Sequence, residues 1–203
     1  MSQTARTGVR FVLSNSTDPD RLTDFRAWYD SYAHALTAIG ELRSADRFEN
    51  ATASGTDDDP RFLALYDIGS TDPAAAWPRT EQSSAYPTPL FDDPRAKLMS
   101  PAFRGSFAAV GSQIADRDHG SRSGVLIVLS NGGDDTARHK WEQDALRLGQ
   151  FYSAARFRLI EGFPAAAEWL EIYEADAAGV PEPLGSAPGS ELQYESYFNT
   201  AQE

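Results

Sequence analysis

The chain of 203 residues contains no cysteine, which excludes disulfide bonds, thiolate nucleophiles and metal sites built on thiolates. Long apolar runs are also missing: no stretch approaches the roughly 20 residues of a membrane-spanning helix, and residues 1–7 lack the apolar segment of a signal peptide. Basic residues are few, since 18 lysines and arginines against 30 aspartates and glutamates leave a net charge of −12. Nucleic acids and anionic membranes are recognised through basic surfaces. We therefore expect a cytoplasmic protein with neither as a partner.

Histidine, the usual acid–base residue at neutral pH, occurs three times. At about 100° per residue, His34 and His139 lie opposite the apolar faces of their predicted helices. His119 lies in a polar stretch. A buried axial ligand for haem is therefore not expected, and no group of histidines and carboxylates has metal-ligand spacing. We predict neither a metal nor a cofactor.

What the sequence does contain is an internal repeat. Residues 8–15 (GVRFVLSN) return as residues 124–131 (GVLIVLSN), with six of the eight positions identical. Two further pairs follow in the same order, 44–48 with 153–157 and 61–67 with 168–174. The repeat predicts two similar units, residues 1–114 and 124–203, joined by a polar linker at 115–123.

The pattern of apolar residues predicts the elements of each unit. In the first we expect strands at 8–14, 43–50, 61–68 and 105–114, a helix at about 19–38, and a second helix from 71 that is interrupted near Pro78. The segment 82–103 is expected to be irregular, except for a short helix that Asp93 and Pro94 begin and that runs through Met99. In the second unit we expect strands at 124–130, 151–159, 167–175 and 191–199, one helix at about 134–148, and a loop at 176–189.

The order β-α-β-β-α-β in the first unit is the ferredoxin-like arrangement, an α+β fold. A four-stranded sheet of this kind has helices on one face and leaves the other face bare. Two such sheets in one chain can cover each other. We therefore predict two ferredoxin-like repeats that close into an eight-stranded α/β barrel with the helices outside.

Three motifs in the first unit resemble the EthD-like branch of the dimeric α/β-barrel superfamily: Trp28-Tyr29-Asp30, SADRF at 44–48 and FLALYD at 62–67. Members of this superfamily usually dimerise through their sheets, so the resemblance implies a tandem-fused version of such a dimer. The superfamily includes cofactor-free monooxygenases, polyketide cyclases, dehydratases, lactone isomerases and haem enzymes. The histidine that commonly follows the Trp-Tyr-Asp motif is replaced by Ala33, so no catalytic histidine is carried over.

Alternation along the strands divides their residues into two rows. We assign the row of Val9, Phe11 and Leu13, with its equivalents in residues 125–129, to the face under the helices. The other row then faces the space between the sheets. It brings arginines, aromatic residues and a glutamate into that space: Arg10, Arg47, Arg156, Arg158, Phe62, Tyr66, Trp169, Glu171 and Tyr173.

This set of side chains favours a pocket for a flat, oxygenated molecule. Glu171, Tyr66 and Tyr173 are the predicted catalytic residues, because a carboxylate or a phenol can transfer a proton. Aromatic rings would stack on the substrate and arginines would bind its oxyanion. The predicted substrate-binding residues are Arg10, Arg47, Arg156, Arg158, Phe62, Trp169, Trp28 and Tyr32. The alternative is a structural ladder of arginine and glutamate, since a buried charge must be paired.

Residues and resemblance together predict a cofactor-independent enzyme of the cyclase, dehydratase or isomerase type. Its substrate would be an aromatic or polyketide-like molecule bound between the two sheets. Two alternatives stay open, a non-catalytic binding or carrier protein with the same pocket and a cofactor-free monooxygenase. Because a fused pair already covers its sheet faces, we expect a monomer, or a homodimer formed through helices or strand edges.

Overall fold

The computed structural model describes residues 6–50, 52–114, 124–163, 167–175, 183–185 and 187–200. The first half contains β1 (Gly8–Ser16), α1 (Leu22–Thr37), β2 (Leu42–Glu49), β3 (Phe62–Ile68), α2 (Pro73–Gln82) and β4 (Met99–Ile114). The second half contains β5 (Gly124–Gly132), α3 (Asp135–Arg147), β6 (Ser153–Phe163), β7 (Trp169–Ala175) and β8 (Ser190–Thr200). Short 3-10 helices lie at Pro19–Arg21, Thr88–Phe91 and Pro94–Leu98. The predicted linker at 115–123 lies outside the described residues.

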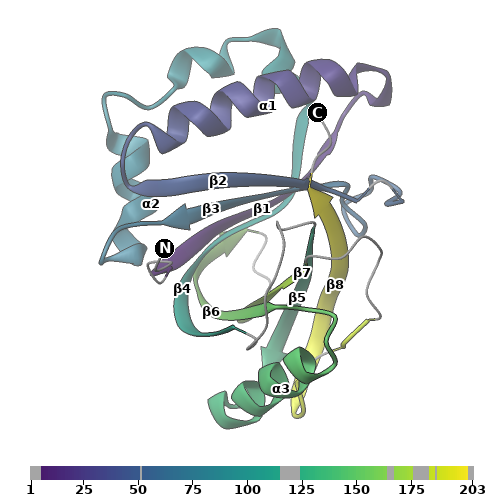
Figure 1. Ribbon diagram of the computed structural model, residues 1–203. Helices are drawn as coiled ribbons and strands as arrows, with labels where there is room; N and C mark the ends of the chain where they lie inside the picture. The colour runs from purple at the N-terminus through teal and green to yellow at the C-terminus, as the bar shows by residue number, and fades with distance from the viewer. Residues whose placement is uncertain are drawn as a thin grey trace.

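The eight strands form one closed antiparallel barrel in the order β1-β3-β2-β8-β5-β7-β6-β4 (Figure 1). Each half contributes four neighbouring strands in the same relative order, β4-β1-β3-β2 and β8-β5-β7-β6. The two halves meet along a long seam between β4 and β6 and a short one where β2 pairs with β8 at Phe48 and Glu49. Helix α1 lies over one side of the barrel and α3 over the opposite side (Figure 1). The predicted α+β class and the eight-stranded barrel with outer helices are therefore confirmed.

Both copies of the repeated stretch form the first strand of their half, and both begin with glycine for a steric reason. A Cβ atom at Gly8 would lie 2.6 Å from the carbonyl oxygen of Phe107 on β4. A Cβ atom at Gly124 would lie 2.5 Å from the carbonyl oxygen of Phe198 on β8. Neighbouring backbone therefore occupies the space of a side chain at the start of β1 and of β5.

The asparagine that ends each copy makes the same hydrogen bond in both halves. Oδ1 of Asn15 accepts from the backbone N–H of Arg61 at 3.0 Å, and Oδ1 of Asn131 accepts from that of Glu168 at 2.8 Å. Each donor residue directly precedes the third strand of its half. Because buried backbone donors need partners, the asparagines hold the entry of β3 and β7 against the end of the first strand.

Helix α2 departs from the sequence prediction. It begins at an N-cap, Asp72, whose carboxylate accepts from the backbone N–H of Ala75, and it runs unbroken through Pro78 to Gln82. The predicted interruption at Pro78 is wrong. Proline removes one helical N–H. Ala76 and Trp77 are buried on the inner face of α2, and their packing stabilises the helical turn before Pro78. In the segment 82–103, the short helix predicted after Asp93 is present as the 3-10 helix Pro94–Leu98, whereas the 3-10 helix Thr88–Phe91 and the first residues of β4 were not predicted.

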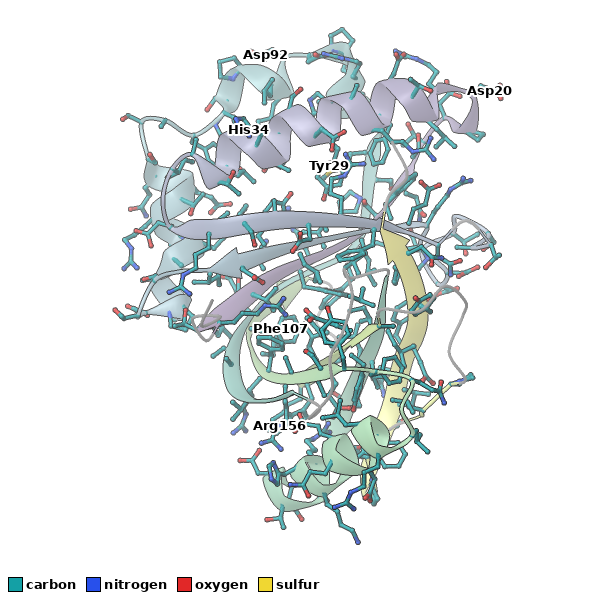
Figure 2. The ribbon with its side chains drawn as sticks, viewed as in Figure 1. Asp20, Tyr29, His34, Asp92, Phe107 and Arg156 are labelled. Carbon is teal, nitrogen blue, oxygen red and sulfur yellow. The ribbon has the colours of Figure 1, made fainter. Side chains whose placement is uncertain are left out.

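The barrel interior is filled by one apolar cluster to which both halves contribute; Phe107, labelled in Figure 2, is one of its members. Its members are Val9, Phe11, Leu13, Phe48, Leu63, Leu65, Phe103, Phe107, Val125, Ile127, Leu129, Ala155, Phe157, Ala167, Leu170, Ile172 and Phe198. These include the row that the sequence analysis placed under the helices, so that assignment is wrong. Period-two alternation shows which residues share a face. It does not show which face is inside, because helices bury the outer face too.

Candidate functional site

Because the two rows of strand residues face the opposite way to the prediction, the predicted site residues on the strands lie on the outer surface of the barrel and not in its interior. They therefore do not share one pocket between the sheets, as the sequence analysis expected. They form two groups on different sides of the barrel, one under α1 and α2 and the other under α3. Tyr29 marks the first side and Arg156 the second in Figure 2.

The first group contains Tyr66 and Phe62 on β3, which pack with Trp28 and Tyr32 of α1 in one buried cluster. Burial raises the pKa of Tyr66 well above its usual value. Burial, with a 3.3 Å hydrogen bond between its hydroxyl and that of Tyr86, also raises the pKa of Tyr32. Both phenols are therefore protonated at neutral pH. They can donate hydrogen bonds, but they are not bases.

Arg47 also belongs to this side of the barrel. Its Nη1 donates to the backbone oxygen of Arg26 at 3.0 Å and to the carboxylate of Asp30, both on α1. Its guanidinium lies 5.0 Å from the ring centre of Tyr29. An open groove of about 740 Å³ runs between α1 and β2 beside these residues. Since Arg26 is also paired, with Glu49, the arginines of this groove already have carboxylate partners.

The second group centres on Glu171 of β7. Its Oε1 accepts from Nη1 of Arg138 at 2.6 Å, and its Oε2 accepts from the hydroxyl of Tyr173 at 2.9 Å. Glu171 is 1% exposed, so both oxygens of a buried carboxylate have hydrogen-bond partners. This is the arrangement of the structural alternative in the sequence analysis, except that the partner of Glu171 lies on helix α3 and not on a neighbouring strand.

Arg138 was not predicted from the sequence, although it is the most deeply buried arginine in this group. It is fully buried and also donates to the hydroxyl of Ser130 at 3.1 Å and to the carbonyl oxygen of Gly132 at 2.5 Å. Its guanidinium lies 4.5 Å from the ring centre of Trp169. The guanidinium of Arg158 lies 5.5 Å from the same ring, but its side chain is 62% exposed. Trp169 thus separates a buried arginine from a solvated one.

Glu142, also on α3, is the second residue that sequence reasoning missed. It is fully buried, yet neither of its carboxylate oxygens has a hydrogen-bond partner within the described residues. Two nitrogen atoms lie slightly beyond hydrogen-bonding distance: Nε of Arg156 at 3.8 Å from Oε1 and Nδ1 of His139 at 4.0 Å from Oε2. The Nη1 of Arg156 donates to the backbone oxygen of Asp135 at 2.8 Å, which holds its guanidinium beside α3.

Burial sets the ionisation of both carboxylates. It raises the pKa of Glu142 to about 7, against the opposing charges of Arg156 and Arg138, and the charge of Glu171 adds to the rise. Burial also raises the pKa of Glu171, against the hydrogen bond from Tyr173 and the charge of Arg138. A carboxyl group that titrates near neutral pH can both accept and donate a proton there.

Unpartnered polar atoms are concentrated in this part of the structure. The buried side-chain atoms without a hydrogen bond here are Nε of Arg138, Nε1 of Trp141, both oxygens of Glu142, Nε of Arg156 and Nε1 of Trp169, six of the eleven such atoms in the described residues. Leaving such a group unsatisfied costs about 1–3 kcal/mol. Native proteins therefore complete such sites with water or a ligand. The group beneath α3 has the donors and acceptors for a polar bound molecule.

The orientation of α3 explains why the sequence analysis missed these residues. The helix begins at the N-cap Asp134, whose carboxylate accepts from the backbone N–H of Ala137. Its buried residues are Arg138, Glu142 and Ala145. The apolar residues of this stretch, Ala137, Trp141, Ala145 and Leu148, predict a different buried face, and Leu148 is 61% exposed. The buried face is therefore rotated away from the apolar one. The i, i+4 spacing of Arg138 and Glu142 beside Ala145 was the signal available in the sequence.

The corresponding place in the first half is apolar. Ala64 lies opposite Val12 in the β1–β3 pair, and Glu171 lies opposite Val128 in the matching β5–β7 pair. Ala64 belongs to the apolar cluster under α1. The first half therefore forms the same four-stranded arrangement with an uncharged residue at this position. The barrel does not require the charge of Glu171 in the second half.

Neither described histidine is buried. His34 is exposed on α1, and the side chain of His139 is 46% exposed. His119 lies outside the described residues. Within the described part of the chain, no three His, Asp or Glu side chains come together as metal ligands. None of the described helices is long and apolar enough to cross a membrane.

No protein-family model and no curated protein matches this chain, whereas solved structures do. An anthrone oxidase-like protein aligns over 97% of this chain and 92% of its own, with a TM-score of 0.50 and 9% identity. A haem-binding protein from Thermus thermophilus aligns over 98% and 93%, with a TM-score of 0.53 and 11% identity. A chlorite dismutase variant from Candidatus Nitrospira defluvii aligns over 98% and 92%, with a TM-score of 0.55 and 8% identity.

At such low identity these likenesses concern the fold and not the activity. They cover nearly the whole of this chain and most of each neighbour, so the similarity extends over both halves of the barrel. Together with the closed antiparallel barrel of eight strands and its outer helices, they show that this chain has the dimeric α/β-barrel fold.

Proposed function

We propose that this chain is a small-molecule enzyme that catalyses proton transfer at a site beneath α3, with Glu142 as the proton-transferring group. One observation carries the proposal: Glu142 is a fully buried carboxylate with no hydrogen-bond partner among the described residues and a pKa of about 7. Perturbed carboxylates of this kind are concentrated at catalytic sites. A cyclase, dehydratase or isomerase acting on an aromatic or polyketide-like molecule needs such a group.

The residues around Glu142 supply the other parts of such a reaction. Arg156 keeps a free Nε–H beside the carboxylate, which can bind an enolate or phenolate oxygen as it develops negative charge. The indole N–H groups of Trp141 and Trp169 are further free donors. His139 lies between Glu142 and solvent and can return the proton through water. Together they suit a flat substrate with several oxygen atoms.

Glu171 and Tyr173 take a different role from the one expected from the sequence. Since Arg138 and Tyr173 already occupy both oxygens of Glu171, we assign these residues to positioning the site. Arg138 is held in place by that carboxylate, and its charge lowers the pKa of Glu142. Tyr66 belongs to the group under α1 and has no part in this proposal.

Haem, which one fold neighbour binds according to its description, does not fit these residues. An axial ligand is a histidine, a thiolate, a methionine or a tyrosine held at a buried cavity. The two described histidines are exposed, the sequence has no cysteine, and Tyr173 is committed to Glu171. The proposed reaction is therefore one that the protein side chains carry out without haem.

The proposal includes the origin of the two halves as tandem-fused ferredoxin-like repeats of the EthD-like branch. Support comes from the shared strand order, the paired glycines and the matching bonds of Asn15 and Asn131. A fused pair can specialise one half. Here the buried carboxylate of Glu171 lies under α3, while its equivalent under α1 is Ala64.

The experiment is hydrogen–deuterium exchange on 2-tetralone, a small aromatic ketone with acidic hydrogens beside its carbonyl. Proton NMR in heavy water follows the loss of the C1 hydrogens with and without protein. We expect exchange above the buffer rate, reduced roughly a hundredfold or more in Glu142→Gln, the usual scale for a lost general base. Glu168→Gln, which changes a carboxylate with 43% exposure, is the control and should exchange like the wild type.

The same samples separate the alternatives. Binding of 2-tetralone without catalysed exchange would favour a carrier over an enzyme. Uptake of dissolved oxygen with a phenolic substrate would favour a cofactor-free monooxygenase. Equal exchange rates in the wild type and in a folded Glu142→Gln variant would remove Glu142 from the mechanism.

A further inference from the structure

A cavity that is separate from the group beneath α3 lies beneath α2, on the opposite side of the barrel. It has a volume of about 240 Å³, room for roughly eight water-sized groups. Its walls come from β1, α2, β4 and β6, and the lining residues are Arg10, Trp77, Glu81, Arg104, Glu161 and Gly162. None of them takes part in the group beneath α3.

Arg10 is the central residue of this cavity, and one edge of its guanidinium is occupied. Nη1 donates to the hydroxyl of Ser106 at 2.9 Å and to Oε1 of Glu161 at 3.2 Å. The hydroxyl of Ser106 donates to the same Glu161 oxygen at 3.1 Å. The guanidinium also lies 4.5 Å from the ring centre of Trp77. Three neighbours on three different elements thus fix its plane.

The other edge of Arg10 is free. Its Nε has no hydrogen-bond partner although the side chain is only 7% exposed, and the described residues offer no partner to Nη2. Nε–H and Nη2–H together form the fork that binds a carboxylate through two parallel hydrogen bonds. Burial lowers the pKa of Arg10, against the nearby Glu161, so its charge is incompletely compensated. The free fork is suited to the carboxylate of a ligand.

Charges of both signs line the cavity, and this narrows the class of ligand. A simple anion at Arg10 would also lie in the field of Glu81 and Glu161, in a chain with a net charge of −12. A simple cation would lie beside the buried guanidinium. A ligand with a carboxylate at one end and an ammonium group at the other can pair with both the arginine and the glutamates of the cavity. We propose that this cavity binds a small zwitterion of the amino-acid class, with its carboxylate on the free fork of Arg10 and its ammonium group near Glu81 and Glu161.

The test uses three probes that differ by one charged group: L-alanine, propionate, which lacks the ammonium group, and ethylamine, which lacks the carboxylate. The indole N–H signal of Trp77 in nitrogen-15 spectra reports binding, after assignment with Trp77→Phe. At concentrations that saturate a millimolar site, L-alanine should shift this signal. Propionate should bind at least tenfold more weakly, and ethylamine should not bind.

Two variants separate the contributions of the carboxylate and the ammonium group. Arg10→Lys keeps the charge but removes the fork, and it should weaken L-alanine binding tenfold or more. Glu81→Gln changes an exposed side chain and should not affect folding. It should weaken L-alanine binding and strengthen propionate binding, two effects of opposite sign. The proposal is overturned if no probe shifts Trp77, if propionate binds as tightly as L-alanine, or if Glu81→Gln changes both affinities in the same direction.

Discussion

The Nε atom of Arg156 lies 3.8 Å from Oε1 of Glu142, within the range of an ion pair but beyond that of a hydrogen bond. Both side chains are buried, and neither of these atoms has a hydrogen-bond partner in the described part of the chain. By contrast, Arg138, one turn before Glu142 on α3, contacts Glu171 of β7 directly at 2.6 Å. The two pairs predict different behaviour under mutation and pH change.

The pH dependence of stability should identify Glu142. Its pKa rises from 4.5 to about 7 on folding, so the folded state binds this proton more tightly than the unfolded state. Protonation of Glu142 in the folded state contributes roughly 3 kcal/mol to the free energy of unfolding. This contribution is fully present below about pH 4.5 and is lost as the pH rises through about 7. We expect the Tm of the wild type to fall relative to Glu142→Gln between about pH 5 and pH 8.

Calorimetry at several pH values checks this expectation. The control is Glu168→Gln, whose side chain is 43% exposed, and its Tm difference from the wild type should stay constant. Parallel curves for the wild type and Glu142→Gln would show that Glu142 titrates normally in the folded state.

The Arg138–Glu171 pair should behave as structure. Glu171→Leu leaves a buried, uncompensated guanidinium and should cost about 3–5 kcal/mol in the free energy of unfolding. Arg138→Met in the same chain removes that charge and should recover most of the loss, because two apolar side chains replace the pair. Urea denaturation of both single variants and the double variant measures the coupling. Additive losses would contradict a direct interaction.

Phe107 tests the inverted strand faces. Phe107→Ala should open a cavity inside the barrel and cost about 3–5 kcal/mol in the free energy of unfolding. Val110→Ala on the same strand is the control, because Val110 is 42% exposed, and it should cost less than about 1 kcal/mol. Chemical denaturation compares them. If the two variants lose equal stability, the interior does not contain this row of side chains.

The barrel closes within one chain and should not need a second one. Its interior cluster draws on strands of both halves, so the sheet faces cover each other within one molecule. Light scattering is therefore expected to give a molar mass near 22.2 kDa. Any dimer should dissociate on dilution without unfolding, since it would use helices or strand edges. A dimer that separates only on denaturation would contradict this view.

The internal repeat made the barrel predictable. Two copies of one strand motif, followed by two further pairs in the same order, implied two similar units whose bare sheet faces must cover each other. The helices predicted at about 134–148 and from 71 begin close to the observed starts of α3 and α2, where Asp134 and Asp72 are local N-cap signals. These signals act through neighbouring residues, so the sequence alone was sufficient to read them.

Tertiary structure decided which face of each strand points inward. The row of Phe11 fills the barrel and the row of Arg10 lies under the helices, the reverse of the prediction. Both rows are buried, so alternation alone could not distinguish them. For the same reason the sequence analysis did not identify Arg138 and Glu142 as buried. Their helix directs these charged residues toward the barrel because Glu171 on β7 and Arg156 on β6 lie opposite them. Buried charges are stable only beside their partners, and those partners are brought together by the fold.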